Sequence, residues 1–207
     1  MNKKNLFLLG ILLFLVFILF SYLVHKDLFT QLDFDNTVKL QDRISRRFDT
    51  PFSVLSLIGS FEISTLFLLF LVIIRRKIKA VLVFILYFSA IFLELYGKIF
   101  VIHPGPPYLF FRNDIPFNFP SSYVQPGSSY PSGHSTRTLF ISMVLMFMIG
   151  SSKKLTPFQK TILFSLVLLF DIAMLVSRVY LGEHWTSDVI GGALLGTSLG
   201  LISLIAL

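Results

Sequence analysis

The chain has 207 residues, of which 55% are hydrophobic, and its mean hydropathy is +0.79. Apolar runs of about 20 residues recur along it, which is the length that crosses a bilayer, so the composition excludes an ordinary soluble domain and predicts an integral membrane protein. The formal charge of +7 does not indicate a nucleic-acid partner, because Lys and Arg cluster at the ends of the apolar runs, and the absence of cysteine excludes disulfides and thiolate metal sites.

Six transmembrane helices are predicted from these runs, within a single domain over residues 1–207. They cover about residues 5–24, 51–74, 80–102, 132–149, 157–180 and 187–207. The first is interpreted as an uncleaved helix rather than a signal peptide, because no small-x-small cleavage site follows it. In the last, Gly192, Gly196 and Gly200 recur at four-residue spacing, which predicts that another helix packs closely against this face.

Two polar segments separate these runs. Residues 25–50 are mixed in charge, and Asp35 or Asn36 could cap a helix with one apolar side, which is typical of a helix lying at the membrane interface. The segment from His103 to Tyr130 holds six of the nine prolines and fits neither a helix nor a regular sheet. Such a long loop indicates function or disorder. Its aromatic residues could form a lid or an access route for a lipid tail: Phe110, Phe111, Phe117, Phe119 and Tyr123.

The basic residues predict an orientation. An even number of spans puts both termini on one side, and the basic turns at residues 75–79 and 153–160 fall on that side with Lys3 and Lys4. The positive-inside rule makes that side cytoplasmic. Five basic residues on the opposite side count against this orientation: Lys26, Lys39, Arg43, Arg46 and Arg47. We expect a multi-pass protein of the plasma (inner) membrane.

With this topology, three polar clusters reach the same extracytoplasmic face. The first is Lys98 followed by His103-Pro104-Gly105-Pro106-Pro107, the second is Pro131-Ser132-Gly133-His134, and the third runs from Ser177 to Asp188. Moving any one of them across a single helix would put it on the wrong side. Ionisable groups beside a membrane segment are costly, so their agreement predicts a functional site.

The chemistry that these clusters favour is phosphoryl transfer. Lys98 and Arg178 supply cations for phosphate oxygens, and Ser132-Gly133 at a helix start supplies a hydroxyl and free backbone N–H groups. One of the histidines His134 and His184 can attack phosphorus while the other protonates the leaving oxygen. Asp188 lies four residues after His184, so it can hydrogen-bond that ring if the piece is helical.

Simpler explanations exist for single residues. Lys98 alone is typical of a snorkelling lysine at a helix end, Ser132 could be only an N-cap, and His184 beside Trp185 could be an interface anchor. A zinc site is the other alternative, built from His103, His134 and His184. It would place Lys98 and Arg178 beside a cation, so we expect neither a metal nor another cofactor.

Together the clusters resemble the signature of the type 2 phosphatidic acid phosphatase family, which shares its site with vanadium haloperoxidases. The family pattern is Lys-x6-Arg-Pro, then Pro-Ser-Gly-His, then Ser-Arg-x5-His-x3-Asp. The second and third parts match fully here, over Pro131–His134 and Ser177–Asp188. The first part departs, because Gly105 stands where the family has arginine, although Lys98 and Pro106 are present.

The resemblance implies a role for each matching residue. His184 would be the nucleophile that forms a phosphohistidine, Asp188 would orient it, and His134 would be the general acid. The phosphate would be held by Lys98, Ser132, the N–H of Gly133, and Arg178. We expect Arg137, three residues after His134 on the same helix face, to replace the missing arginine. His103 and Arg112 are weaker candidates for that replacement.

Acidic residues near the motifs are assigned partners. Glu94 precedes Lys98 by four residues and is expected to pair with it. Asp171, two turns before Arg178, could be the partner of that arginine, and Glu62 stays unassigned.

The sequence thus predicts a metal-independent phosphatase acting on a membrane lipid phosphate. Family members act on phosphatidic acid, phosphatidylglycerol phosphate and polyprenyl phosphates or diphosphates, and undecaprenyl diphosphate is a natural candidate on the extracytoplasmic face. A phosphotransferase using the same phosphohistidine, or a lipid-phosphate-binding membrane protein without turnover, are the alternatives, the latter suggested by Gly105. No nucleic acid and no obligate protein partner are inferred.

Overall fold

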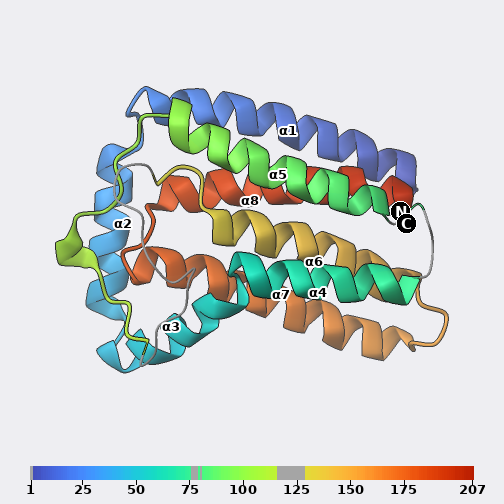
Figure 1. Ribbon diagram of the computed structural model, residues 1–207. Coiled ribbons are helices and arrows are strands. Elements are labelled where there is room, and N and C mark those ends of the chain that lie inside the picture. Colours follow the sequence, from blue (N-terminus) through green and yellow to red (C-terminus); the bar gives the residue numbers. More distant parts are fainter. Residues whose placement is uncertain (1, 76–78, 80, 116–128) are drawn as a thin grey trace.

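The computed structural model describes residues 2–75, 79, 81–115 and 129–207, and the regular elements within them are helices. The bundle in Figure 1 consists of α1 (Lys3–His25), α4 (Phe61–Arg75), α5 (Val81–Phe100), α6 (Gly133–Ser151), α7 (Pro157–Tyr180) and α8 (Thr186–Ser203). Both termini lie at one end of this bundle, and α2 (Thr30–Arg43) crosses the other end. The predicted all-helical membrane fold is therefore confirmed.

The number of spans is settled only in part. Among the described residues, α1, α5, α7 and the segment Thr186–Ala206 are each long and apolar enough to cross a membrane. The bent pair of α3 (Asp49–Ile58) and α4 makes a fifth candidate. Helix α6 is not among these candidates, because its first turns carry polar side chains such as Thr136 and Arg137. Six spans stay a prediction.

The predicted single helix over residues 51–74 is wrong, because the chain breaks within it. Helix α3 follows a 3-10 turn at Arg46–Phe48, and the chain bends by 50° at Gly59-Ser60 before α4 begins. The Ser60 hydroxyl accepts a hydrogen bond from the N–H of Ile63 (3.4 Å), so it caps the new helix. The sequence contains a glycine that ends one helix and a serine that caps the next, but the continuous apolar run around them predicted a single helix.

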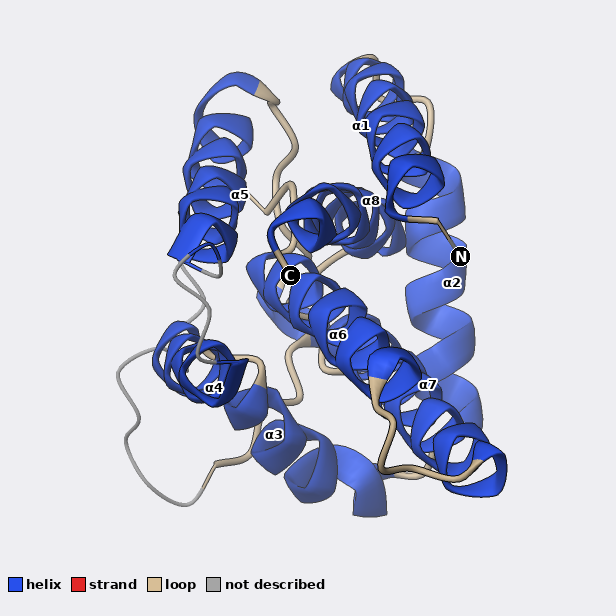
Figure 2. Ribbon diagram, turned by 90° about the vertical axis from the view of Figure 1, so that its right-hand side faces the viewer, coloured by secondary structure: helices blue, strands red, loops and turns tan. Residues whose placement is uncertain are grey.

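The three glycines of α8 pack against α6, as predicted. A Cβ at position 192 or 196 would collide with the carbonyl oxygen of Ser132 or Thr136, and one at position 200 would lie 3.0 Å from the carbonyl oxygen of Phe140. Figure 2 shows the two helices in the middle of the bundle, with α1 and α5 on one side and α4 and α7 on the other. This close contact fixes the start of α6 against the start of α8.

Helix α2 covers the segment for which an interfacial helix is predicted, and its position at a membrane interface stays a prediction. It begins at Thr30 rather than at a cap formed by Asp35 or Asn36. It is fastened to the end of α7 by Gln41, whose Nε2 donates to the carbonyl oxygens of Tyr180 (2.8 Å) and Phe110 (2.6 Å). The helix therefore lies over the end of the bundle where the three motifs are found (Figure 1).

Some predictions fall outside the described residues. These are the contributions of Phe117, Phe119 and Tyr123 to a lid, and the positions of Arg76 and Lys77 in a basic turn. Of the proposed lid, Phe110 and Phe111 are described. The Phe110 ring lies edge-on to Trp185 with 6.2 Å between centroids, and the Phe111 ring stacks on Tyr108 with 5.9 Å between centroids.

Candidate active site

The third motif folds as a turn between two helices. Helix α7 ends at Tyr180 and α8 begins at Thr186, and between them Gly182 has a φ of +66°. Any residue with a side chain would be strained in that conformation, and a Cβ there would collide with the backbone oxygen of Phe110. The N–H of His184 donates to the carbonyl oxygen of Arg178 (3.3 Å), so the turn closes with His184 just ahead of α8.

His184 and Asp188 meet across the start of α8. The two atoms His184 Nδ1 and Asp188 Oδ2 are 3.4 Å apart, and the same Oδ2 accepts the N–H of Trp185 at 2.9 Å. The Asp188 side chain is fully buried, whereas that of His184 is 12% exposed and can be reached by a substrate. His184 precedes the helix instead of lying within it. A carboxylate in this place can hold a proton on Nδ1 and leave Nε2 as the free nitrogen.

The second motif is joined to the third by a backbone hydrogen bond. The N–H of Ser132 donates to the carbonyl oxygen of Asp188 (3.0 Å), and the Ser132 hydroxyl accepts the N–H of Ser135 (3.4 Å) as the N-cap of α6. Gly133 and His134 therefore form the first turn, where unpaired N–H groups and the helix dipole favour an anion.

The end of α3 and the bend that follows it lie against His134. Its Nε2 lies 3.5 Å from the hydroxyl of Ser56, and a Cβ at Gly59 would come within 2.9 Å of its ring carbon Cδ2. Arg137, one turn further along α6, donates from Nε to the carbonyl oxygen of Gly59 (3.1 Å). The bend thus supplies one wall of the site.

The first motif reaches the second through Glu94. One oxygen of this carboxylate lies 3.3 Å from Lys98 Nζ, and the other accepts from Arg137 Nη1 at 3.1 Å. The pairing of Glu94 with Lys98 was predicted from their spacing and is confirmed. Both the Glu94 carboxylate and the Arg137 guanidinium lie directly beside Gly133, where a Cβ would be 2.7 Å from Arg137 Nη1. Lys98 and Arg137 are therefore two cations close to the start of α6.

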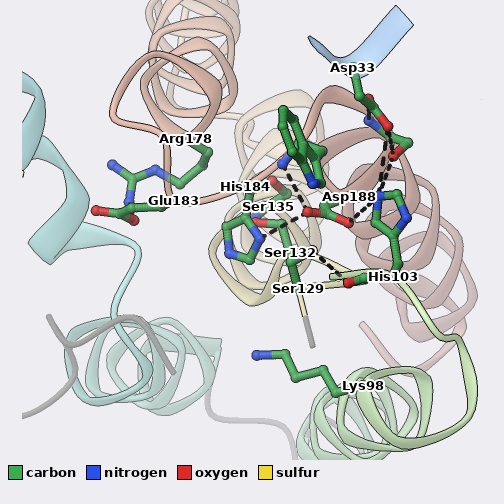
Figure 3. A network of polar contacts seen from close by, with 12 residues as sticks. Asp33, Lys98, His103, Ser129, Ser132, Ser135, Arg178, Glu183, His184 and Asp188 are labelled. Carbon is green, nitrogen blue, oxygen red and sulfur yellow. Dashed lines mark hydrogen bonds and ion pairs between the residues drawn. The ribbon is translucent and has the colours of Figure 1, made fainter. Parts of the chain in front are cut away.

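Arg178 is fully buried, and its guanidinium is already occupied. It pairs with Glu183 and donates to the hydroxyls of Ser56 and Ser177, and Glu183 in turn accepts from Asn113 Nδ2 at 2.6 Å. In the view of Figure 3 this pair lies on one side of His184, and Asp188 lies on the other. The predicted contact of Asp171 with Arg178 is not found, because Asp171 instead accepts a hydrogen bond from Ser142 (2.6 Å).

The two weaker candidates for the missing arginine lie elsewhere. Nε2 of the buried His103 is 3.5 Å from Asp188 Oδ1 and 3.7 Å from Asp33 Oδ2, so it faces two carboxylates that would repel a phosphate. Arg112 lies with its guanidinium carbon 5.2 Å from the ring centre of Tyr180 and donates to the carbonyl oxygen of Gln41. We therefore propose neither residue as a phosphate ligand.

The described residues include no cluster of three or more His, Asp or Glu side chains with the geometry of a metal site. The zinc alternative would have required His103, His134 and His184 to converge. Their polar neighbours differ instead: His103 faces Asp33 and Asp188, His134 faces Ser56, and His184 faces Asp188.

Comparison with known families decides the relationship that this geometry suggests. The sequence model of the PAP2 superfamily matches residues 79–207, which include all three motifs. The chain belongs to the PAP2 superfamily.

Two solved structures of PAP2 proteins or their relatives resemble the fold. A transmembrane PAP2-type phosphatidylglycerolphosphate phosphatase from Bacillus subtilis superposes with a TM-score of 0.76 at 18% identity, covering 94% of each chain. LpxE from Aquifex aeolicus superposes with a TM-score of 0.62 at 26% identity, covering 84% of this chain and 95% of that one. A search of curated protein sequences found no match.

Within this PAP2 fold, sequence reasoning missed four residues that touch the motifs. Glu183 and Ser56 hold Arg178, and Asp33 and Ser187 lie behind Asp188. Glu183 stands inside the third motif, so its charge next to His184 was a usable signal. Ser56 and Asp33 come from α3 and α2, and nothing local in the sequence indicates that these helices reach the site.

Proposed function

We propose that this PAP2 protein is a metal-independent lipid phosphate phosphatase that works through a phosphohistidine on His184. The observation that carries the proposal is the meeting of all three motifs at one end of the bundle. The Ser132–Asp188 backbone hydrogen bond joins the second and third motifs, and Glu94 joins Lys98 to Arg137 beside Gly133. These contacts gather a nucleophile, an acid and several cations around one helix start.

In the first step His184 attacks phosphorus. Nδ1 faces Asp188, so Nε2 forms the new N–P bond while the bond from phosphorus to the lipid oxygen breaks. Asp188 keeps the proton on Nδ1 and stabilises the positive ring that forms. His134, which lies across the site beside Ser56, gives a proton to the leaving oxygen.

In the second step a water molecule attacks the phosphohistidine. His134 accepts the proton of this water, the N–P bond breaks, and inorganic phosphate leaves with His184 restored. The same residue therefore serves as acid and then as base, and no net proton is left on the protein.

The phosphate would be held by charges and by the start of α6. Lys98, Arg137 and Arg178 are the cations, and the Ser132 hydroxyl with the N–H of Gly133 completes the cradle. Glu94 pairs with both Lys98 and Arg137, and Glu183 pairs with Arg178. A phosphate dianion would compete with these carboxylates for the same cations as it binds.

The position of the site suits a lipid. We propose that α2 lies at the extracytoplasmic interface of the plasma membrane, that six spans leave both termini in the cytoplasm, and that the bilayer is the protein's main partner. An apolar groove between α4, α6 and α7 includes Ile58, Phe67, Thr138 and Phe170, and Thr138 lies one turn after His134. This groove could take the lipid tail. Phosphatidic acid, phosphatidylglycerol phosphate and undecaprenyl diphosphate are the candidate substrates.

A phosphate-release assay in excess EDTA on these three lipids tests the proposal. Release from at least one lipid is expected with the wild-type protein and is expected to be lost in His184→Asn. Transfer that depends on an added alcohol would favour the phosphotransferase, and binding without release would favour a non-catalytic protein. A trapped phospho-enzyme that persists in His184→Asn would contradict the assignment of the nucleophile.

A further inference from the structure

A second polar group lies behind Asp188, on the side away from His184 (Figure 3). His103 follows α5, and its Nε2 lies 3.5 Å from Asp188 Oδ1. The same nitrogen lies 3.2 Å from the Ser187 hydroxyl and 3.7 Å from Asp33 Oδ2. Asp33 comes from α2, the helix that crosses the end of the bundle. All four side chains are buried, so water does not screen or satisfy them.

The positions of the protons in this group follow from matching each hydrogen-bond donor to an acceptor. Asp33 accepts the N–H of Ser187 at 2.8 Å and its hydroxyl at 2.6 Å. Because the single hydroxyl proton of Ser187 is then committed to Asp33, the Ser187 oxygen can only accept from His103. Asp188 Oδ1 is buried and has no hydrogen-bond partner of ordinary geometry among the described residues. The three oxygens near His103 Nε2 can therefore only accept from it, and among them Asp188 Oδ1 has no other donor within the described part of the chain.

From these donors and acceptors we propose that His103 is a positioning residue, which carries its proton on Nε2 and shares it between Asp188 and the Asp33–Ser187 pair. The proposal rests on the proposed function, since it gives Asp188 its orientation toward His184. His184, Asp188, His103 and Asp33 then form a row in which imidazoles and carboxylates alternate. Helix α2 thereby contributes to the active site without touching the substrate.

This arrangement reduces the repulsion between two buried carboxylates. Two carboxylates, Asp33 and Asp188, lie buried on either side of one imidazole, and they repel each other. The N–H of His103 stabilises the ionised form of Asp188, which is the form that can hold the proton of His184 in place. Among the described residues, the other titratable group that faces His103 is Tyr130, whose ring is edge-on at 6.4 Å and stays neutral because burial raises its phenol pKa.

Removing the donor should therefore impair the chemical step more than substrate binding. We expect His103→Ala to lower kcat about 10- to 100-fold, the range that one hydrogen bond to a charged group supplies, with KM changed less than about twofold. His103→Gln keeps an N–H donor and should recover part of kcat.

A double variant separates positioning from mere structural support. Asp33→Asn removes the second carboxylate, so Asp33→Asn/His103→Ala should be more active than His103→Ala alone. If His103 only fills space, the two losses should add instead. His25→Ala, which changes an exposed histidine at the end of α1, is the matched control and should keep wild-type activity.

A nitrogen NMR measurement on histidine-labelled full-length protein in detergent makes the test independent of turnover. The signal lost in His103→Gln should show a protonated Nε2. An unprotonated Nε2, or a kcat in His103→Ala equal to that of the wild type, would overturn the proposal. If the wild-type protein releases no phosphate from any lipid, the proposed function fails, whereas the protonation of His103 can still be read.

Discussion

The strongest test of the site concerns Arg137, which we propose replaces the arginine that the family has at the position of Gly105. Its guanidinium donates to Glu94 (3.1 Å) and to the carbonyl oxygen of Gly59 (3.1 Å), and it lies beside Gly133 at the start of α6. A hydrogen bond to a charged group contributes about 1.5–3 kcal/mol, and each 1.4 kcal/mol is about tenfold in rate or affinity. If Arg137 binds the phosphate, Arg137→Ala should lower kcat/KM about 10- to 100-fold.

The same substitution also perturbs stability, and the assay must separate the two effects. Removing one partner of a buried ion pair costs about 3–5 kcal/mol, because the other charge is left unpaired. Lys98 remains next to Glu94 and should reduce that cost. Glu94→Gln/Arg137→Ala avoids the unpaired carboxylate, so its unfolding temperature in detergent should exceed that of Arg137→Ala.

Phosphate release and inhibition by orthovanadate are measured for wild type, Arg137→Ala, Arg137→Lys and the double variant. We expect Arg137→Lys to recover part of the affinity, since it keeps the charge but loses the planar fork. A folded Arg137→Ala protein whose kcat/KM and vanadate inhibition lie within about twofold of wild type would refute the reasoning, and Arg137 would then be a structural partner of Glu94.

Three further outcomes are expected. Glu183→Gln leaves the buried Arg178 without its carboxylate partner. Orthovanadate should then bind more tightly, by about tenfold or less, and the unfolding temperature of the protein without vanadate should fall. Weaker vanadate binding would contradict this. Gly182→Ala combines a φ of +66° with a collision against Phe110, so activity and thermal stability should drop together, and an unchanged melting curve would refute the local strain. Burial raises the pKa of the Asp33 carboxyl above its ordinary 3.8, so the folded state holds this proton more tightly than the unfolded state does. The contribution of Asp33 to the free energy of unfolding therefore falls as pH rises from about 3.8 through the pKa of the folded state. Asp33→Asn should remove this pH dependence from unfolding curves measured in mild acid.

The sequence determined the class of protein and located the three motifs that meet at the candidate site. Hydropathy located the long helices because a bilayer demands runs of apolar residues, and the predicted helix over residues 157–180 has the bounds of α7, Pro157 and Tyr180. Motif spacing placed Asp188 in reach of His184, since both lie within one short turn and helix start. The close packing of α8 on α6 followed from glycines four residues apart.

Only the tertiary structure decided which distant helices complete the site. The break at Gly59-Ser60 brings Ser56 to His134 and Arg178, although the apolar run around it reads as one continuous helix. Asp33 reaches Ser187 across 154 residues of chain, and it also reaches His103, because α2 folds over the bundle end. The one apolar side of this helix predicts an interfacial position, but it does not indicate which residues Asp33 contacts. Spacing along a chain fixes local neighbours, but contacts between helices depend on the bends and crossings that packing alone selects.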